Sequence, residues 1–367
     1  MGRRNRLKTT PGNAGARESE AMTEAILEPD LPIGDPHHHL WDRRSFSADP
    51  SAPVQHGFEH VTRLASRYMF EELLADATSG HNVIATVFVD CGAFYRADGP
   101  EAYKSLGETE FVNGVAARSA SGVYGPFRAC AGIVSNVNLE ANGAGAGRIL
   151  EAHIAAGGGR FRGIRNGAAY DADPAVLGPL AHFPPGLYRS AKFREGYATL
   201  APLGLTFDAW LLEPQLPDVI DLARAFADTP MVLDHVGTPL GIGVYAGTHA
   251  ERFAPWRDNI RELAKSQNVC VKLGGLAMVF PGFPSYMQQP PATSEQLAAE
   301  WKPYIETCIE AFGPERCMFE SNFPVDLCGA KYAVLWNAFK RLTAGCSASE
   351  KAALYSGTAT RFYKLKL

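Results

Sequence analysis

Short apolar runs alternate along the chain with longer segments whose apolar residues recur at helical spacing. The runs predict eight strands, at about residues 32–36, 82–91, 128–134, 161–168, 205–212, 230–235, 268–274 and 316–322. Two of the runs, VIATVFV at 83–89 and VCVKL at 269–273, are nearly continuous and rich in β-branched residues. Strands that are covered on both faces have this pattern, which favours a parallel sheet.

The segments between the strands have the periodicity of amphipathic helices. In 215–227, apolar residues recur at positions i, i+3, i+4 and i+7, which predicts a helix. Similar stripes predict helices at 63–77, 256–265, 297–312 and 331–342. Alternating strands and helices indicate an α/β fold, here a closed (β/α)8 TIM barrel. An open doubly wound sheet is less favoured, because no phosphate-binding glycine motif follows a strand.

Length and composition are compatible with one large barrel. The chain has 367 residues, of which 46 % are hydrophobic and 20 % are charged, which is typical of globular proteins. We expect a single TIM-barrel domain over 31–367 with long loops on its active face. Residues 1–30 are polar and contain no apolar stretch of the kind found in secretory signals, so we expect a disordered tail there.

The net charge and the cysteine content limit which classes of binding partner and which cellular compartment we expect. The formal net charge of −4 argues against a nucleic-acid partner, and the apolar runs are too short for a membrane span. The seven cysteines include no CxxC pair, so we expect buried free thiols in a reducing compartment, which favours the cytoplasm. We expect a small-molecule substrate as the partner, and a homo-oligomer stays open.

Histidines follow two of the predicted strands. His37 and His39 end the first strand and project to the same side, whereas His38 points away, because strand side chains alternate. His235 ends the sixth strand. Imidazoles at the C-terminal mouth of a barrel can bind a divalent metal or hold a substrate oxygen. For each histidine taken alone, a structural role is the alternative.

Six segments carry a family resemblance. They are DPHHHLWD at 35–42, TVFVDCGA at 86–93, FRGIRN at 161–166, LDHVGTP at 233–239, KLGGL at 272–276 and FESNFP at 319–324. In this order they resemble the amidohydrolase superfamily, and specifically the amidohydrolase-2 branch of metal-dependent or metal-independent TIM-barrel hydrolases, which includes lactonases. The resemblance extends from about residue 33 to the C-terminus.

The resemblance implies roles for the histidines. His37, His39 and His235 would surround the scissile carbonyl oxygen, either directly or as ligands of one divalent metal, with zinc or manganese expected. It implies no organic cofactor.

The resemblance also exposes a departure at the last strand. Where the family commonly has an Asp that takes a proton from the attacking water, this chain has Asn322. An amide has no basic site at neutral pH, although it can orient a water or coordinate a metal through its oxygen. Asp326 is our first candidate for the missing base, with a structural turn role as its alternative. Glu213, after the fifth strand, is the second candidate.

Other polar and aromatic residues are candidates for substrate binding. Arg165, on the fourth strand, suits a substrate carboxylate, or else a buried ion pair with Asp208 or Asp234. Lys272 lies in an apolar strand and therefore needs a carboxylate partner inside the barrel. Trp210 is expected in the pocket wall, with core packing as the alternative.

The loop over 278–293 combines prolines with aromatic residues that include Phe280 and Tyr286. It suggests either a lid that selects an apolar or aromatic-derived substrate or a contact between subunits.

Together these features predict an enzyme that hydrolyses a lactone or a related carbonyl compound through attack by water. A metal-dependent decarboxylase of the same superfamily and a non-catalytic small-molecule binder are the alternatives.

Overall fold

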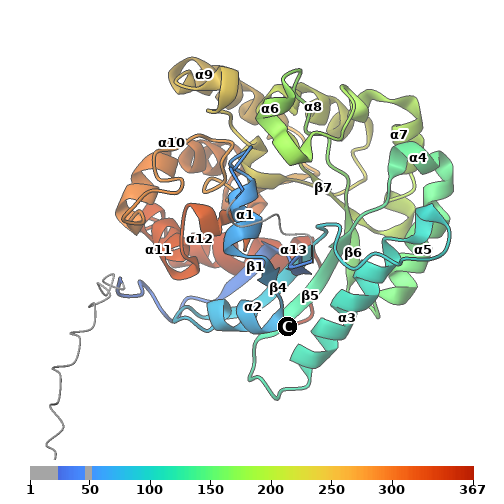
Figure 1. The fold of residues 1–367 in the computed structure, drawn as a ribbon, viewed down its shortest axis with the longest axis horizontal. Coiled ribbons are helices and arrows are strands. Elements are labelled where there is room, and N and C mark those ends of the chain that lie inside the picture. The colour runs from blue at the N-terminus through green and yellow to red at the C-terminus, as the bar shows by residue number, and fades with distance from the viewer. Residues whose placement is uncertain (1–23, 46–51) are drawn as a thin grey trace, which may run out of the picture.

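The computed structural model describes residues 24–45 and 52–367. Eight parallel strands form one sheet whose spatial order follows the chain, with helices around the strands (Figure 1). The strands are β1 (Ile33–His38), β4 (Val83–Val89), β5 (Arg128–Ser135), β6 (Phe161–Arg165), β7 (Thr206–Ala209), β8 (Met231–Leu233), β9 (Val269–Leu273) and β10 (Cys317–Phe319). The predicted TIM barrel is therefore confirmed, with all eight strands at the expected places.

The first and last strands close the ring through backbone contacts at their C-terminal ends. His39 N donates to Phe323 O at 2.8 Å, and Asn322 N donates to His37 O at 2.9 Å. A parallel bridge joins His38 to Phe323. Several strands end earlier than predicted, because the residues after them turn into the barrel mouth.

Helices connect successive strands. They are α1 (Glu59–Leu64), α2 (Phe70–Ala77), α3 (Leu106–Ala120), α4 (Leu139–Asn142), α5 (Ala146–Ala156), α6 (Pro174–Leu177), α7 (Ala191–Tyr197), α8 (Leu216–Ala225), α9 (His249–Leu263), α10 (Ser294–Phe312), α11 (Tyr332–Leu342), α12 (Ala348–Ala352) and α13 (Thr358–Phe362). Local signals set their ends. Helix α10 begins after the capping box formed by Thr293 and Gln296 and ends at Gly313, whose φ is 76°.

The helix predicted over 63–77 is wrong in its middle. Helix α1 ends at Leu64, and α2 starts at Phe70. Between them β3 (Arg67–Tyr68) pairs antiparallel with β2 (Trp41–Asp42). The apolar periodicity continues across the break because α1, β3 and α2 all bury side chains in the protein interior.

Residues 1–23 of the expected tail lie outside the described residues. Residues 24–30, assigned to that tail from the sequence, contact the barrel. Glu24 accepts hydrogen bonds from Ser294 N at 2.7 Å and Asn337 Nδ2 at 3.3 Å, and Lys340 Nζ donates to Glu28 O at 2.8 Å. These residues therefore belong to the surface of the barrel domain.

Two further expectations concern cysteines and membranes. All seven cysteines are free, and four of them are buried. In the described part of the chain, no helix combines the length and apolarity needed to cross a bilayer.

Candidate active site

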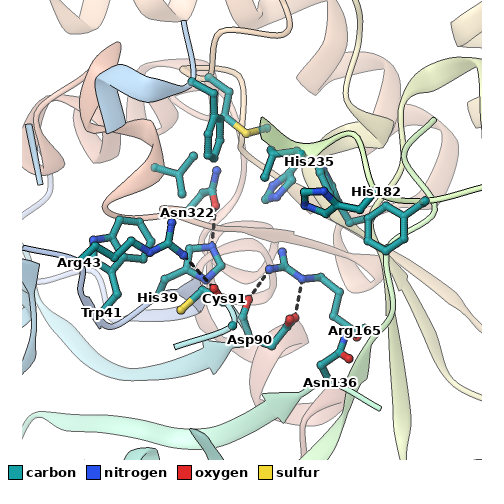
Figure 2. A pocket seen from close by; sticks show the side chains of 18 residues that line it. His39, Trp41, Arg43, Asp90, Cys91, Asn136, Arg165, His182, His235 and Asn322 are labelled. Carbon is teal, nitrogen blue, oxygen red and sulfur yellow. Dashed lines mark hydrogen bonds and ion pairs between the residues drawn. The ribbon is translucent and has the colours of Figure 1, made fainter. Parts of the chain in front are cut away.

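A cavity of about 270 Å³ opens at the C-terminal ends of the strands (Figure 2). Its lining includes residues at or just after seven different strands, His39, Asp90, Asn136, Arg165, Trp210, His235 and Asn322, together with the polar residues Arg43 and His182 from connecting segments. In a TIM barrel this end carries the chemistry. Of the residues proposed from the sequence, the structure places His39, Arg165, Trp210, His235 and Asn322 in the lining.

His37 lies beside these residues but does not line the cavity. Its ring centroid is 4.9 Å from that of His39 and 4.7 Å from that of His235. His38 points the other way, with Nε2 2.9 Å from Thr86 Oγ1, as the strand alternation predicts. Burial lowers the pKa of His37 well below its ordinary value, and the nearby Lys272 ammonium lowers it further. Both effects favour the neutral form of the His37 imidazole.

His235 is held by a carboxylate that the sequence reasoning missed. Glu320, directly after β10, is fully buried, and its Oε1 lies 2.7 Å from His235 Nδ1 and 3.2 Å from His235 N. Burial lowers the pKa of His235, but the charges of Glu320 and Asp234 outweigh this and raise it above the ordinary value. His235 also has a left-handed backbone, with φ of 55°. Non-glycine residues in this conformation often lie at functional sites.

Asn322 and Asp326 form a pair rather than two independent groups. Asn322 Nδ2 donates to Asp326 Oδ1 at 2.8 Å, and Asn322 Oδ1 lies 3.3 Å from His39 Nε2. Asp326 is fully buried behind the amide and does not line the cavity. Burial raises the pKa of Asp326 to about 7. Asp326 therefore contacts the site through Asn322.

The main ion-pair partner of Arg165 is Asp90. The sequence had suggested a substrate carboxylate, or else Asp208 or Asp234. Arg165 Nε donates to Asp90 Oδ1 at 2.8 Å, and Nη2 donates to Asp90 O. Asp234 is a secondary partner, 3.7 Å from Nη1. The Arg165 charge is thus already balanced on the cavity wall.

Lys272 has the carboxylate partners that its buried position requires. Its Nζ lies 2.7 Å from Asp208 Oδ2 and 3.0 Å from Asp234 Oδ1. The same ammonium is 3.1 Å from His37 Nδ1. These contacts form a buried charged layer under the cavity.

A group that could hold a metal differs by one ligand from the predicted set. His37, Asp234 and His235 each offer a donor atom within 4.8 Å of the others. His39 is not in this group, because its Nδ1 is 2.8 Å from Val89 O and its Nε2 faces Asn322. Asp234 is buried and faces two cations, with Oδ1 3.0 Å from Lys272 Nζ and Oδ2 3.7 Å from Arg165 Nη1. Two imidazoles and a carboxylate are ligand types that zinc and manganese accept.

Besides His37 and Asp326, three further sequence candidates do not line the cavity. Glu213 is ion-paired with Arg252 in a separate hollow, so it is not placed to activate water here. Phe280 is buried, 6.1 Å from the Phe58 ring, and Tyr286 donates to the backbone oxygen of Gly57 at 2.6 Å. The loop aromatics thus support the segment that carries Phe58, and Phe58 itself lines the cavity.

Sequence reasoning missed Asp90, Arg43 and Phe58, which line the cavity, and Glu320, which lies behind His235. Asp90 and Glu320 each follow an apolar strand directly, which was the signal available for both. Arg43 and Phe58 come from the connection between β1 and β4, where no strand pattern marks them.

Comparisons with known proteins agree with this architecture. The Amidohydro_2 family, described as amidohydrolase, matches residues 35–365. The uncharacterized protein y4mH of Sinorhizobium fredii is 33% identical over 343 residues, which cover 92% of this chain and 99% of that protein. L-fucono-1,5-lactonase of Burkholderia multivorans is 32% identical over 188 residues, 48% of this chain and 56% of the lactonase.

A solved structure shows the same fold. An amidohydrolase from Burkholderia multivorans with bound zinc superposes with a TM-score of 0.66 at 26% identity, covering 91% of this chain and 99% of that one. Because the family match spans nearly the whole barrel and the strand-end histidines occupy its mouth, the chain belongs to the Amidohydro_2 family of amidohydrolases.

Proposed function

We propose that this protein hydrolyses a cyclic ester, by attack of water on a carbonyl held in the cavity. The observation that carries the proposal is the convergence of His39, His235 and Asn322 beside Arg165 on one cavity (Figure 2). Membership of the amidohydrolase family indicates a hydrolase or lyase. Similarity to a lactonase over half of the chain supports the choice of a lactone.

His235 is the group best placed to take the proton from water. Its Nδ1 lies 2.7 Å from a Glu320 carboxylate oxygen, so Nδ1 carries the hydrogen and Nε2 keeps its electron pair. Glu320 would stabilise the imidazolium as it forms, as a buried carboxylate does behind other catalytic histidines. The proton then passes to the alkoxide that leaves when the ring C–O bond breaks, which yields a hydroxy acid.

The remaining residues orient the reactants. Asn322 Oδ1 can accept a hydrogen bond from the attacking water, and Asp326 fixes the amide in that orientation. The Arg165 guanidinium lies on the same cavity and would stabilise negative charge on the carbonyl oxygen. Such preorganised stabilisation is commonly the largest catalytic contribution.

A divalent metal would be held by His37, Asp234 and His235. Zinc or manganese there would polarise the carbonyl as a Lewis acid. It would also need the electron pair of His235, so metal ligation and proton acceptance by this side chain exclude each other. Elemental analysis of protein purified without chelator decides between the two roles.

The proposal is tested by acid release from a panel of lactones, followed with a pH indicator. We expect turnover by the wild type, and a loss in kcat of about 100-fold or more for both His235→Gln and Glu320→Gln. His60→Gln, on α1 and outside the cavity lining, is the matched control and should retain full activity.

Two results would contradict the proposal. The first is a metal-replete protein that hydrolyses no lactone on the panel. The second is release of CO₂ from unsaturated carboxylic acids, which would assign the site to a decarboxylase instead.

A further inference from the structure

A hollow of about 290 Å³ lies at the N-terminal ends of β5 and β6, and we call it the basal hollow. Its walls come from the last turns of α3, the glycine turn before β6 and the first residues of the two strands. The C-terminal segment of the chain lies close to β5 and α3 and contributes Lys366 (Figure 1). Strands β5 and β6 end near Asn136 and Arg165 in the catalytic cavity, so the two cavities lie at opposite ends of the same strands.

All charged side chains that line the basal hollow are cations. They are Arg128, Arg160, Arg162 and Lys366. Within the described ranges, none of the four takes part in an ion pair. Burial lowers the pKa of Arg162, and the charge of Arg160 lowers it further, with no described carboxylate acting against them. Four positive charges therefore gather here without a counter-charge, in a chain whose formal net charge is −4.

The three arginines keep hydrogen-bond donors that the protein does not use. In each of them Nη1 donates to a nearby oxygen, at 2.8 Å in Arg128 and Arg160 and at 3.2 Å in Arg162, whereas Nη2 has no acceptor among the described residues. Arg162 Nε is buried and has no hydrogen-bond partner in that part of the chain. A charged donor in this state is unfavourable unless an anion lies close to it. The protein therefore positions these guanidinium groups without satisfying them.

Every other residue that lines the basal hollow is an alanine or a glycine. They are Ala116, Ala120, Ala129, Ala131, Gly158 and Gly159. These side chains are too short to fill the space between the cations. A Cβ at Gly159 would have no neighbour within 4 Å, so the wall beside Arg160 is open. The lining offers neither an aromatic face nor a side-chain oxygen, so it selects a ligand by negative charge.

We propose that the basal hollow binds a small molecule that carries two linked phosphate groups. Guanidinium groups bind phosphate oxygens through paired, charge-assisted hydrogen bonds. One phosphate ester carries about 1.5 to 2 negative charges at pH 7, so two phosphate groups balance four cations. A dicarboxylate would bring only about half of that charge. A nucleic-acid backbone fits less well, because it is bound by cations that form a stripe along a surface. This site does not depend on the proposed lactone hydrolysis.

Inorganic pyrophosphate is the probe, titrated by calorimetry into the intact protein at neutral pH and low salt, without added metal. We expect one molecule to bind per chain, at least tenfold more tightly than the dicarboxylate succinate. Added sodium chloride should weaken the binding, because it screens the charges. Affinity for pyrophosphate no higher than that for succinate would overturn the proposal.

Two substitutions in the basal hollow locate the contact. Arg162→Gln should weaken pyrophosphate binding by about 10- to 100-fold, since it removes charge-assisted hydrogen bonds from a partly buried guanidinium. Lys366→Gln should weaken it by about 2- to 5-fold, because the ammonium is exposed and screened by water. The matched control is Arg257→Gln on α9, which removes an arginine that pairs with Asp258 outside both cavities, and it should bind as the wild type does.

Arg43→Gln separates the two cavities, because Arg43 lines the catalytic one. It should leave pyrophosphate binding unchanged. Loss of binding in Arg43→Gln, with full affinity in Arg162→Gln and Lys366→Gln, would place the anion in the catalytic cavity and overturn the proposal. Thermal unfolding of each variant shows that folded proteins are compared. The absence of lactone turnover would refute the proposed function and leave these binding results as they are.

Discussion

Asn322 shows how one residue changes the chemistry available to a barrel mouth. It adopts a left-handed conformation with φ of 53°, which asparagine tolerates better than most residues. This backbone directs its amide between His39 and Asp326. The carboxylate that the family resemblance leads us to expect at position 322 therefore has no substitute at the same point in space. Asp326 accepts a hydrogen bond from the Asn322 amide, whereas Glu320 contacts Nδ1 of His235.

Substitutions at Asp326 separate a positioning role from a catalytic one. Asp326→Asn keeps an oxygen to accept the Asn322 Nδ2–H bond and removes the charge, so kcat/KM should stay within about tenfold of wild type. Asp326→Ala frees the Asn322 amide, and loss of its orientation should lower kcat by about 100-fold. Steady-state kinetics on the same lactone check both values.

Equal, large losses in the two Asp326 variants would instead make Asp326 the proton acceptor. Circular dichroism and thermal unfolding of each variant show that the comparison is made between folded proteins.

At the scale of elements, the end of β9 passes very close to His235 and Glu320. Gly274 and Gly275 follow this strand directly. A Cβ at Gly275 would lie 2.5 Å from His235 Cβ, and one at Gly274 would lie 2.4 Å from Glu320 Cγ. Gly275 also has a φ of 68°. The KLGGL segment thus needs two small residues so that β9 can support the His235–Glu320 pair.

Gly275→Ala should therefore disturb catalysis more than stability. We expect a loss in kcat/KM of about 100-fold, because His235 must shift, and a destabilisation of about 1–3 kcal/mol from overlap and backbone strain. Kinetics and urea unfolding measure the two effects.

The control is Gly122→Ala, whose φ is 78° but whose Cβ would have no neighbour within 4 Å. It carries the backbone strain without the overlap, so its activity should be unchanged. Comparable loss of activity in both variants would show that overlap at His235 does not matter.

At the scale of the whole molecule, folding buries many ionisable groups in and around the barrel. Lys272 is matched by Asp208 and Asp234. Glu108, on α3, is fully buried and accepts hydrogen bonds from Cys91 N at 3.1 Å and Ala93 N at 2.9 Å, which ties the helix to the loop after β4. Burial, and after it the nearby Asp90 charge, raise the pKa of Glu108 to about 8.

This pKa predicts a pH dependence of stability. A carboxyl group with a raised pKa binds its proton more tightly in the folded state, so its contribution is complete below the unfolded pKa near 4.5 and is lost as pH rises through about 8. Glu108→Gln removes this titration. Relative to the wild type, the variant should gain at least about 1.4 kcal/mol in free energy of unfolding between pH 5 and pH 8.5, the equivalent of one pKa unit.

Urea unfolding at several pH values measures the difference. Glu110→Gln, on the same helix and exposed beside Arg96, serves as control and should follow the wild-type curve. A Glu108→Gln curve that stays parallel to the wild type would show that Glu108 is charged in the folded protein at all these pH values.

The eight strands and the strand-end positions of His37, His39 and His235 could be predicted from the sequence, because strand periodicity is local and parallel barrel strands end at one face. The departure at Asn322 was also visible there. The choice of partners was decided only by the tertiary structure. Glu320 supports His235, Asp90 pairs with Arg165, Glu213 turns to Arg252 outside the cavity, and Arg43 enters it from a connecting loop. The partners in these pairs lie 39 to 85 residues apart, and strand register and loop paths, which no local pattern encodes, determine which charges meet in the barrel mouth.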